Sequence, residues 1–98
     1  MSKYEVLYII DNDVDDDKKS DIVSRFGALV EDNGGSVVSV DKWGTRKFAY
    51  RIKVNGQYKQ EGYYVLMSFE AAGEFVAELE RQMRNTESIV RELVTLCE

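Results

Sequence analysis

Apolar and polar side chains alternate strictly along residues 47–54. The apolar side of this segment holds Phe48, Tyr50, Ile52 and Val54, and the other side holds Lys47, Ala49, Arg51 and Lys53. Because successive side chains of a β-strand point to opposite faces, the alternation predicts a strand with one apolar face and one basic face. The chain as a whole has a formal net charge of −5, so this local basic charge is unusual and indicates a binding surface.

Hydrophobic periodicity predicts further elements on both sides of this strand. Strands are expected at residues 3–10, 36–54, 63–69 and 89–96, and helices at residues 17–32 and 71–84. Asn33-Gly34-Gly35 is expected to end the first helix, since glycine readily adopts the left-handed conformation found there. A bulge is expected at Gly44, and a hairpin turn at residues 55–62.

This order of elements predicts an α+β fold of the ferredoxin-like β-α-β-β-α-β type. Right-handed crossovers then give a four-stranded antiparallel sheet with two helices on one face. Residues 1–98 are expected to form a single domain, since no linker, repeat or low-complexity segment interrupts them. In this topology the strand at residues 36–54 lies at an edge. Its charged residues Asp41, Lys42, Arg46 and Lys47 would then prevent edge-to-edge aggregation, dock a partner, or do both.

An acidic segment, residues 11–17, follows the first strand. Asp11, Asp13 and Asp15 have the spacing of the first ligands of a calcium loop, but Asp16 and Ile22 occupy the positions of its glycine and closing glutamate. Carboxylates at the start of a helix cap free amides and interact favourably with the helix dipole. We therefore expect a helix entry, and no metal site.

Composition excludes several classes of protein. The chain has no histidine, which removes the commonest general base and metal ligand, and its one cysteine, Cys97, has no internal disulfide partner. No apolar run approaches the roughly 18–20 residues needed to span a bilayer, so a cytoplasmic protein is expected. The acidic balance also disfavours binding to naked nucleic acid without a basic helper, because such binding depends on neutralising phosphates.

Four short motifs occur in the same order as in one known family. They are Tyr4-Glu5, the segment Trp43-Gly44-Thr45-Arg46-Lys47-Phe48-Ala49-Tyr50-Arg51-Ile52, Tyr64-Val65-Leu66-Met67, and Leu79-Glu80 with Arg84, Ile89 and Arg91. Through these motifs the chain resembles the bacterial small-subunit ribosomal protein six family (bS6 type). The resemblance implies a structural component of the small ribosomal subunit rather than an enzyme, without a cofactor or a small-molecule substrate, and located at the ribosome in the cytoplasm.

The resemblance also implies two partners. In that family the domain pairs with the small, basic ribosomal protein eighteen, called the basic partner below, and the two together bind 16S ribosomal RNA in its central domain, at the platform. A basic partner would supply the phosphate-neutralising charge that this acidic chain lacks. No membrane association is implied.

Candidate site residues follow from the positions of these motifs. For ribosomal RNA they are Lys3, Tyr4, Arg46, Lys47, Arg51, Arg84 and Arg91, and for the basic partner they are Lys42, Trp43, Arg46, Lys47 and Tyr50. Arginine suits bidentate contact with phosphate, and tryptophan is a frequent anchor in interfaces. Arg84 and Arg91 could equally be ordinary solvated surface, and Trp43 could fill an edge of the core. Arg51 stands where the family usually has a proline.

Three alternatives use the same fold. The first, a single-strand RNA-binding module, stacks bases on aromatic residues of its first and third strands. Here Glu61 and Val65 break the corresponding motif, so Tyr8, Tyr63 and Phe69 are expected to be half-buried strand residues. The second is a non-ribosomal protein-interaction module that pairs through its edge strand. The third, a small acylphosphatase-like hydrolase, is disfavoured because residues 11–17 are acidic and would repel phosphate.

Overall fold

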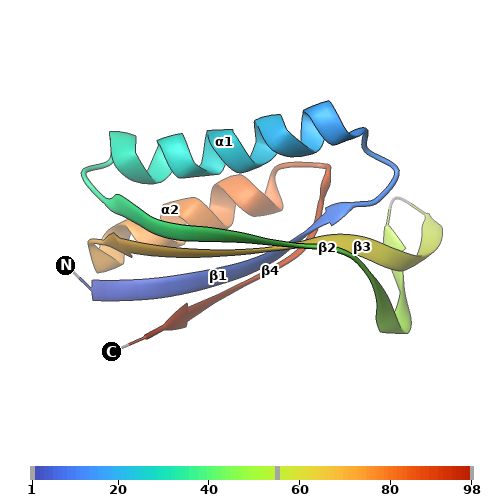
Figure 1. Cartoon of the computed structure of the whole chain (residues 1–98). Coiled ribbons are helices and arrows are strands. Elements are labelled where there is room, and N and C mark those ends of the chain that lie inside the picture. The colour runs from blue at the N-terminus through green and yellow to red at the C-terminus, as the bar shows by residue number, and fades with distance from the viewer. Residues whose placement is uncertain (1, 55, 98) are drawn as a thin grey trace.

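The computed structural model describes residues 2–54 and 56–97, with only the backbone for residues 49–52 and 54. Its elements are β1 (Ser2–Asp11), α1 (Asp16–Asp32), β2 (Ser36–Val54), β3 (Gln57–Ala71), α2 (Gly73–Arg84) and β4 (Ile89–Leu96) (Figure 1). This order confirms the expected β-α-β-β-α-β arrangement. Neither helix of the described residues is long and apolar enough to cross a membrane.

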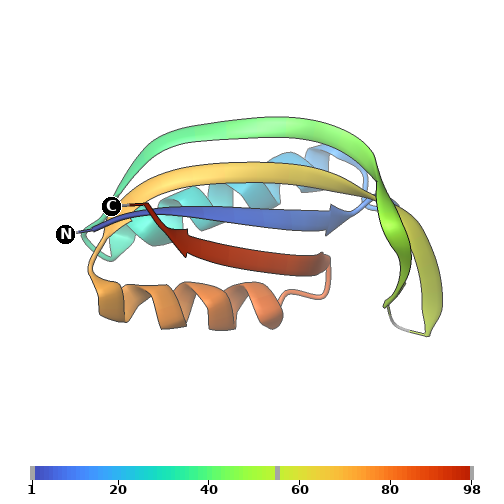
Figure 2. The ribbon, with the colours of Figure 1, turned by 90° about the horizontal axis from the view of Figure 1, so that it is seen from below.

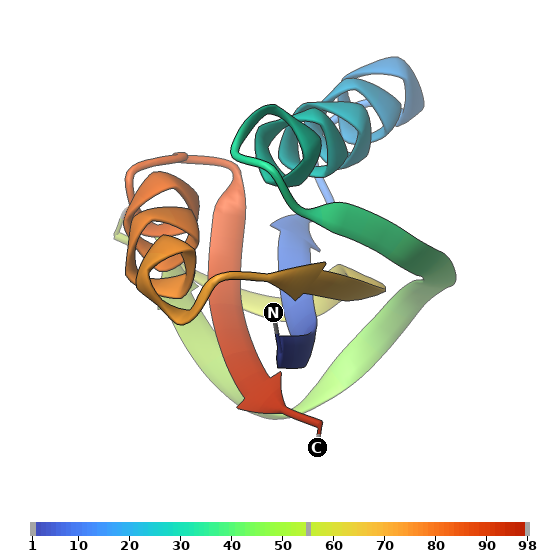
Figure 3. The same cartoon turned by 90° about the vertical axis from the view of Figure 1, so that its left-hand side faces the viewer.

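The four strands form one antiparallel sheet in the order β2-β3-β1-β4, which confirms that β2 is an edge strand. Both helices lie over the same side of this sheet, with α1 and α2 next to each other (Figures 1 and 3). The opposite side carries no helix, and it is called the open face below. The structure thus confirms the ferredoxin-like fold.

The hydrophobic core lies between the sheet and the helices. The alternation of β1 places Val6, Tyr8 and Ile10 on the helix side, where all three are fully buried. They pack with buried residues of β3, α1 and α2, which include Val65, Met67, Phe69, Phe26, Val30, Leu79 and Met83. The core thus accounts for the apolar side chains on the helix side of the sheet, and it contributes no covering layer to the open face.

Helix α1 begins and ends where its sequence signals predict. The Asp15 side chain caps its first turn by accepting a 2.8 Å hydrogen bond from the Lys18 amide. At the other end, Gly34 has a positive φ of 84°, a conformation that glycine adopts without steric cost. The acidic segment therefore acts as a helix entry, as expected.

The β2–β3 hairpin differs from the prediction in two ways. Strand β3 begins at Gln57 rather than at residue 63, so the expected long turn is wrong, because Val54 pairs directly with Gln57. The pairing of β2 with β3 also shifts between Lys47 and Ile52, so the two-faced alternation does not run unbroken from residue 47 to 54. Beyond this shift the hairpin bends away from the helices and leaves the line of the other strands (Figures 1 and 2).

Replacing Gly62 by alanine should destabilise the fold. Gly62 is buried in β3, and a Cβ there would overlap Ile9 and lie 2.8 Å from Cζ of Phe48. We expect Gly62→Ala to lower the free energy of unfolding by about 1–3 kcal/mol, measured by urea denaturation. Gly27→Ala is the matched control: its Cβ would lie 3.8 Å from Cγ2 of Val37, and alanine should stabilise the helix by about 0.5–1 kcal/mol. Equal effects of the two changes would contradict the close approach at Gly62.

Replacing Tyr8 by phenylalanine should not destabilise the fold. The Tyr8 hydroxyl is buried and has no hydrogen-bond partner within the described residues, and burial, together with the nearby Tyr63, raises the pKa of Tyr8. An unsatisfied buried hydroxyl costs free energy in the folded state, so Tyr8→Phe should raise the unfolding free energy by about 1 kcal/mol. A decrease of similar size in the free energy of unfolding, measured by thermal or urea denaturation, would reveal a partner for this hydroxyl, such as a buried water.

Candidate nucleic-acid and partner interface

The pairing of residues between neighbouring strands shows which side chains lie on the open face. Directly paired residues of neighbouring strands point to the same side of a sheet. Gly44 pairs with Tyr64, Tyr64 with Ile9, and Ile9 with Arg91, so these four residues form one row across β2, β3, β1 and β4. The side chains of Tyr64, Ile9 and Arg91 therefore share the open face.

An aromatic patch lies at the β2 end of this row. It consists of Trp43, Tyr64 and Phe48. The Trp43 ring stacks on Tyr64 with centroids 6.3 Å apart and planes at 8°, and the Phe48 and Tyr64 centroids are 6.2 Å apart. Arg46 places its guanidinium carbon 5.4 Å from the Trp43 centroid, which is the geometry of a cation–π contact. Trp43 is 42% exposed, so the patch presents aromatic surface to solvent.

The bulge at Gly44 creates the aromatic patch. The register shifts between Lys42 and Gly44, which leaves Trp43 as an extra residue between two paired ones. Gly44 has a positive φ of 85°, and the expected bulge is therefore confirmed. This extra residue is what allows Trp43 to lie over Tyr64, while Lys42 on its other side points toward the helices.

Apolar surface continues from the aromatic patch along the open face. Leu66 pairs with Leu7, and Leu7 pairs with Leu93, which is 64% exposed. Val38 of β2 is a further exposed apolar residue. Leu96 is also exposed, but it pairs with Tyr4 and therefore lies on the helix side. Exposed apolar surface of this kind, bordered by charge, is typical of an interface with a partner.

Two arginines border this surface, and one lysine lies at its far end. Arg46 covers Trp43 on the β2 side, and Arg91 lies at the β4 end of the row with Tyr64. The Arg91 guanidinium has no ion-pair or hydrogen-bond partner in the described part of the chain. Lys3 is exposed and pairs with Glu70. The structure thus places Trp43, Arg46 and Arg91 on the same face of the sheet, with Trp43 and Arg46 at the β2 edge and Arg91 at the β4 edge.

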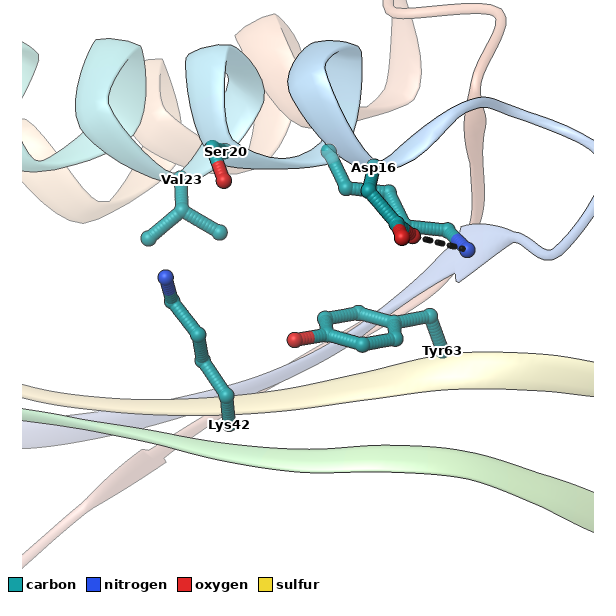
Figure 4. A pocket seen from close by; sticks show the side chains of 6 residues that line it. Asp16, Ser20, Val23, Lys42 and Tyr63 are labelled. Atoms are coloured by element: carbon teal, nitrogen blue, oxygen red, sulfur yellow. Dashed lines mark ion pairs between the residues drawn. The ribbon is translucent and has the colours of Figure 1, made fainter.

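Lys42 and Lys47 lie on the helix side of β2 instead. Lys42 pairs with Val65 and Lys47 with Glu61, two residues of β3 on the helix side. The Lys42 side chain points toward α1, into a cavity of about 240 Å³ whose walls include Ser20 and Tyr63 (Figure 4). The basic residues of β2 are therefore divided between two faces.

That cavity is bordered by a lysine with partners of its own. Lys19 is only 8% exposed, and its amino group lies 3.6 Å from the Asp16 carboxylate and 5.1 Å from the Tyr63 centroid. Its charge is thus balanced locally, whereas Lys42 has no ion pair within the described residues.

The remaining candidates lie elsewhere. Tyr4 is half-buried and stacks on Phe69 with centroids 5.6 Å apart, so its ring packs against the core. Arg84 is exposed but lies 3.2 Å from the Glu92 carboxylate and 3.6 Å from Glu80. The candidates Tyr50 and Arg51 have side chains outside the described residues.

The structure also shows which residues sequence reasoning missed. Tyr64 is the centre of the aromatic patch, but the sequence drew attention to Tyr8, Tyr63 and Phe69 instead. Tyr8 and Phe69 are fully buried on the helix side, and Tyr63 is half-buried there, so none of the three offers a stacking surface on the open face. The sequence did contain a signal for Tyr64. In a strand that buries Val65 and Met67 on one face, the alternation of side chains places Tyr64 on the other face.

No metal site is found in residues 2–54 and 56–97. Within these residues, no group of three or more His, Cys, Asp or Glu side chains lies close enough to hold an ion. The residues of the open face can bind a partner through aromatic stacking, apolar contact and arginine.

The chain is similar to known proteins over almost its whole length. The family model "Ribosomal protein S6" matches residues 3–95. The small ribosomal subunit protein bS6 of Carboxydothermus hydrogenoformans is 42% identical over 94 residues, which cover 96% of this chain and 94% of the relative. The corresponding protein of Desulfitobacterium hafniense is 40% identical over 95 residues, covering 97% and 96%.

A solved structure agrees with these sequence comparisons. The crystal structure of 30S ribosomal protein S6 from Thermotoga maritima superposes with a TM-score of 0.89 at 31% identity, covering 98% of this chain and 87% of that chain. The motifs, the fold and the two sequence comparisons agree, and the chain belongs to the ribosomal protein S6 family.

Proposed function

We propose that this protein is a structural component of the small ribosomal subunit that binds 16S ribosomal RNA together with the basic partner, ribosomal protein eighteen. The observation that carries this proposal is the family match over residues 3–95. Relatives named small ribosomal subunit protein bS6 align over nearly their full length, which supports a single domain located at the ribosome in the cytoplasm.

The open face suits a protein partner. Its centre is apolar and aromatic, with Leu66, Leu93 and the Trp43–Tyr64 stack, and such centres carry most of the binding energy in interfaces. The chain has a net charge of −5, so a basic partner is attracted to it and associates rapidly. The basic partner therefore covers the aromatic patch and the apolar row beside it.

Ribosomal RNA then contacts the basic residues around this interface. Arg91 and Lys3 are exposed and lie on the open face, and Arg46 borders it at the edge strand. Few phosphates are neutralised by this chain alone, because acidic side chains outnumber basic ones by 18 to 13. The partner supplies most of the positive charge, and this chain supplies shape and a few arginine contacts.

The isolated chain should bind its RNA junction weakly, and the complex with the basic partner should bind it tightly. In the complex, Arg91→Met should reduce the log–log slope of affinity against salt by about one unit, because one phosphate contact is lost. Arg81 is the matched control, since it is an exposed arginine of α2 held by Glu78 at 2.6 Å. Arg81→Met should leave the slope unchanged in a filter-binding series. Equal slopes for all three proteins would remove Arg91 from the RNA contacts.

Trp43→Ala should weaken binding of the basic partner by about 30-fold or more, since a central tryptophan is a typical hot spot. Calorimetric titration of the two purified proteins measures this directly. Tyr58→Ala provides the control, because Tyr58 is an exposed aromatic near the hairpin turn, outside the aromatic patch. The control should change the affinity by less than about twofold. Full retention of affinity by Trp43→Ala would move the partner away from the open face.

Sedimentation of a cell lysate distinguishes the ribosomal role from the alternatives. The chain should migrate with the small ribosomal subunit in a sucrose gradient and remain there in moderate salt. Recovery only at the top of the gradient would contradict the ribosomal role and favour an interaction module of the same fold.

A further inference from the structure

The outer half of the β2–β3 hairpin has few main-chain connections to the rest of the sheet. Residues 48–51 of β2 have no paired residue in β3, and the regular pairing resumes only at Ile52 with Lys59. The pairs beyond this shift form the bent end of the hairpin in Figure 2. Without other contacts, such a segment could change its angle to the sheet by rotating at residues 48–51.

Side chains at the end of β1 and in the loop after it contact both strands of the hairpin. The Lys59 amino group, on β3, bonds to the Asp13 carboxylate and lies 3.8 Å from that of Asp11. The Thr45 hydroxyl, on β2, donates a 2.8 Å hydrogen bond to Oδ1 of Asn12. Three consecutive residues, the last of β1 and the first two of the loop after it, therefore bind the hairpin at two places, one on each side of the register shift.

The Lys59 contacts are better protected from solvent than an ordinary surface ion pair. The Lys59 and Asp11 side chains are 17% and 18% exposed, although Asp13 is open to solvent. The hydrogen bond to Asp13 raises the pKa of Lys59. The loop is also ordered on its own, because the Asp13 amide donates a 3.1 Å hydrogen bond to Oδ1 of Asp11. Partly buried pairs are screened less by salt than exposed ones.

We propose that Lys59 is a positioning residue that fastens the outer hairpin to Asp11, at the end of β1, and to Asp13, in the loop that follows. Phe48 is the first residue of the unpaired segment, so the angle of the outer hairpin decides how its ring lies beside Tyr64. Arg46 pairs with Gly62 on the sheet side of the shift and keeps its place beside Trp43. The fastening belongs to the free protein and does not require a partner. Its consequence for binding of the basic partner rests on the proposed function.

Hydrogen exchange on the full chain tests the fastening. Lys59→Met keeps the length of the side chain but removes its charge, and it should accelerate amide exchange at residues 57–59 by about tenfold or more. Exchange of the core amides of Val65 and Met67 should stay unchanged, since a purely global loss of stability would accelerate them too. Lys59→Arg should restore slow exchange, because it keeps a charged donor.

Lys53→Met is the matched control, since Lys53 is an exposed lysine of the same hairpin and the charge change is identical. It should leave exchange at residues 57–59 unchanged. Asp13→Asn combined with Lys59→Met should accelerate exchange by less than the product of the single effects, as expected for two groups in one interaction. Equal exchange in the Lys59 and Lys53 variants, or full additivity with Asp13→Asn, would overturn the proposal.

A binding measurement then tests the consequence separately. Lys59→Met should weaken binding of the basic partner by about three- to tenfold, because the partner must select one hairpin angle from several. Failure of the wild-type chain to bind this partner would contradict the proposed function and leave the exchange result intact. Unchanged exchange in Lys59→Met would overturn the fastening whatever the partner does.

Discussion

Burial of one face of the sheet beneath α1 and α2 is the constraint on which the other features of this protein depend. Tyr8, Phe26, Phe69 and Leu79 lie fully buried between the sheet and the helices, and this burial assigns every second residue of β1 and β3 to the core. The residues between them must then lie on the open face. Tyr64 lies on the open face because Val65, the next residue, is buried in the core on the other side.

In the edge strand β2, a bulge changes which residues lie on each face of the sheet. A regular strand would place alternate charged residues on one face, but the bulge at Gly44 shifts the register by one residue. Trp43 and Arg46 consequently face outward together, whereas Lys42 points under α1. The basic residues of β2 therefore lie on two different faces of the sheet.

The distribution of charge also distinguishes the open face from the rest of the surface. The chain is acidic overall, yet its open face has arginine at both ends of an apolar and aromatic centre. Such a surface is suited to a basic protein that also contacts RNA, because neither charge nor apolar area is sufficient on its own. The contacts of Lys59 with the acidic loop link this surface to the otherwise weakly attached hairpin end.

The sequence by itself determined the order of elements, the edge position of β2, the entry of α1 at its aspartates and the family. These features depend on local periodicity, capping and short motifs, all of which are visible in a linear chain. Only the tertiary structure decided the pairing of Val54 with Gln57, the interruption of the ladder after Lys47 and the association of Trp43 with Tyr64. Those features depend on the register between strands, which is set by packing between residues distant in sequence and not by the pattern within one strand.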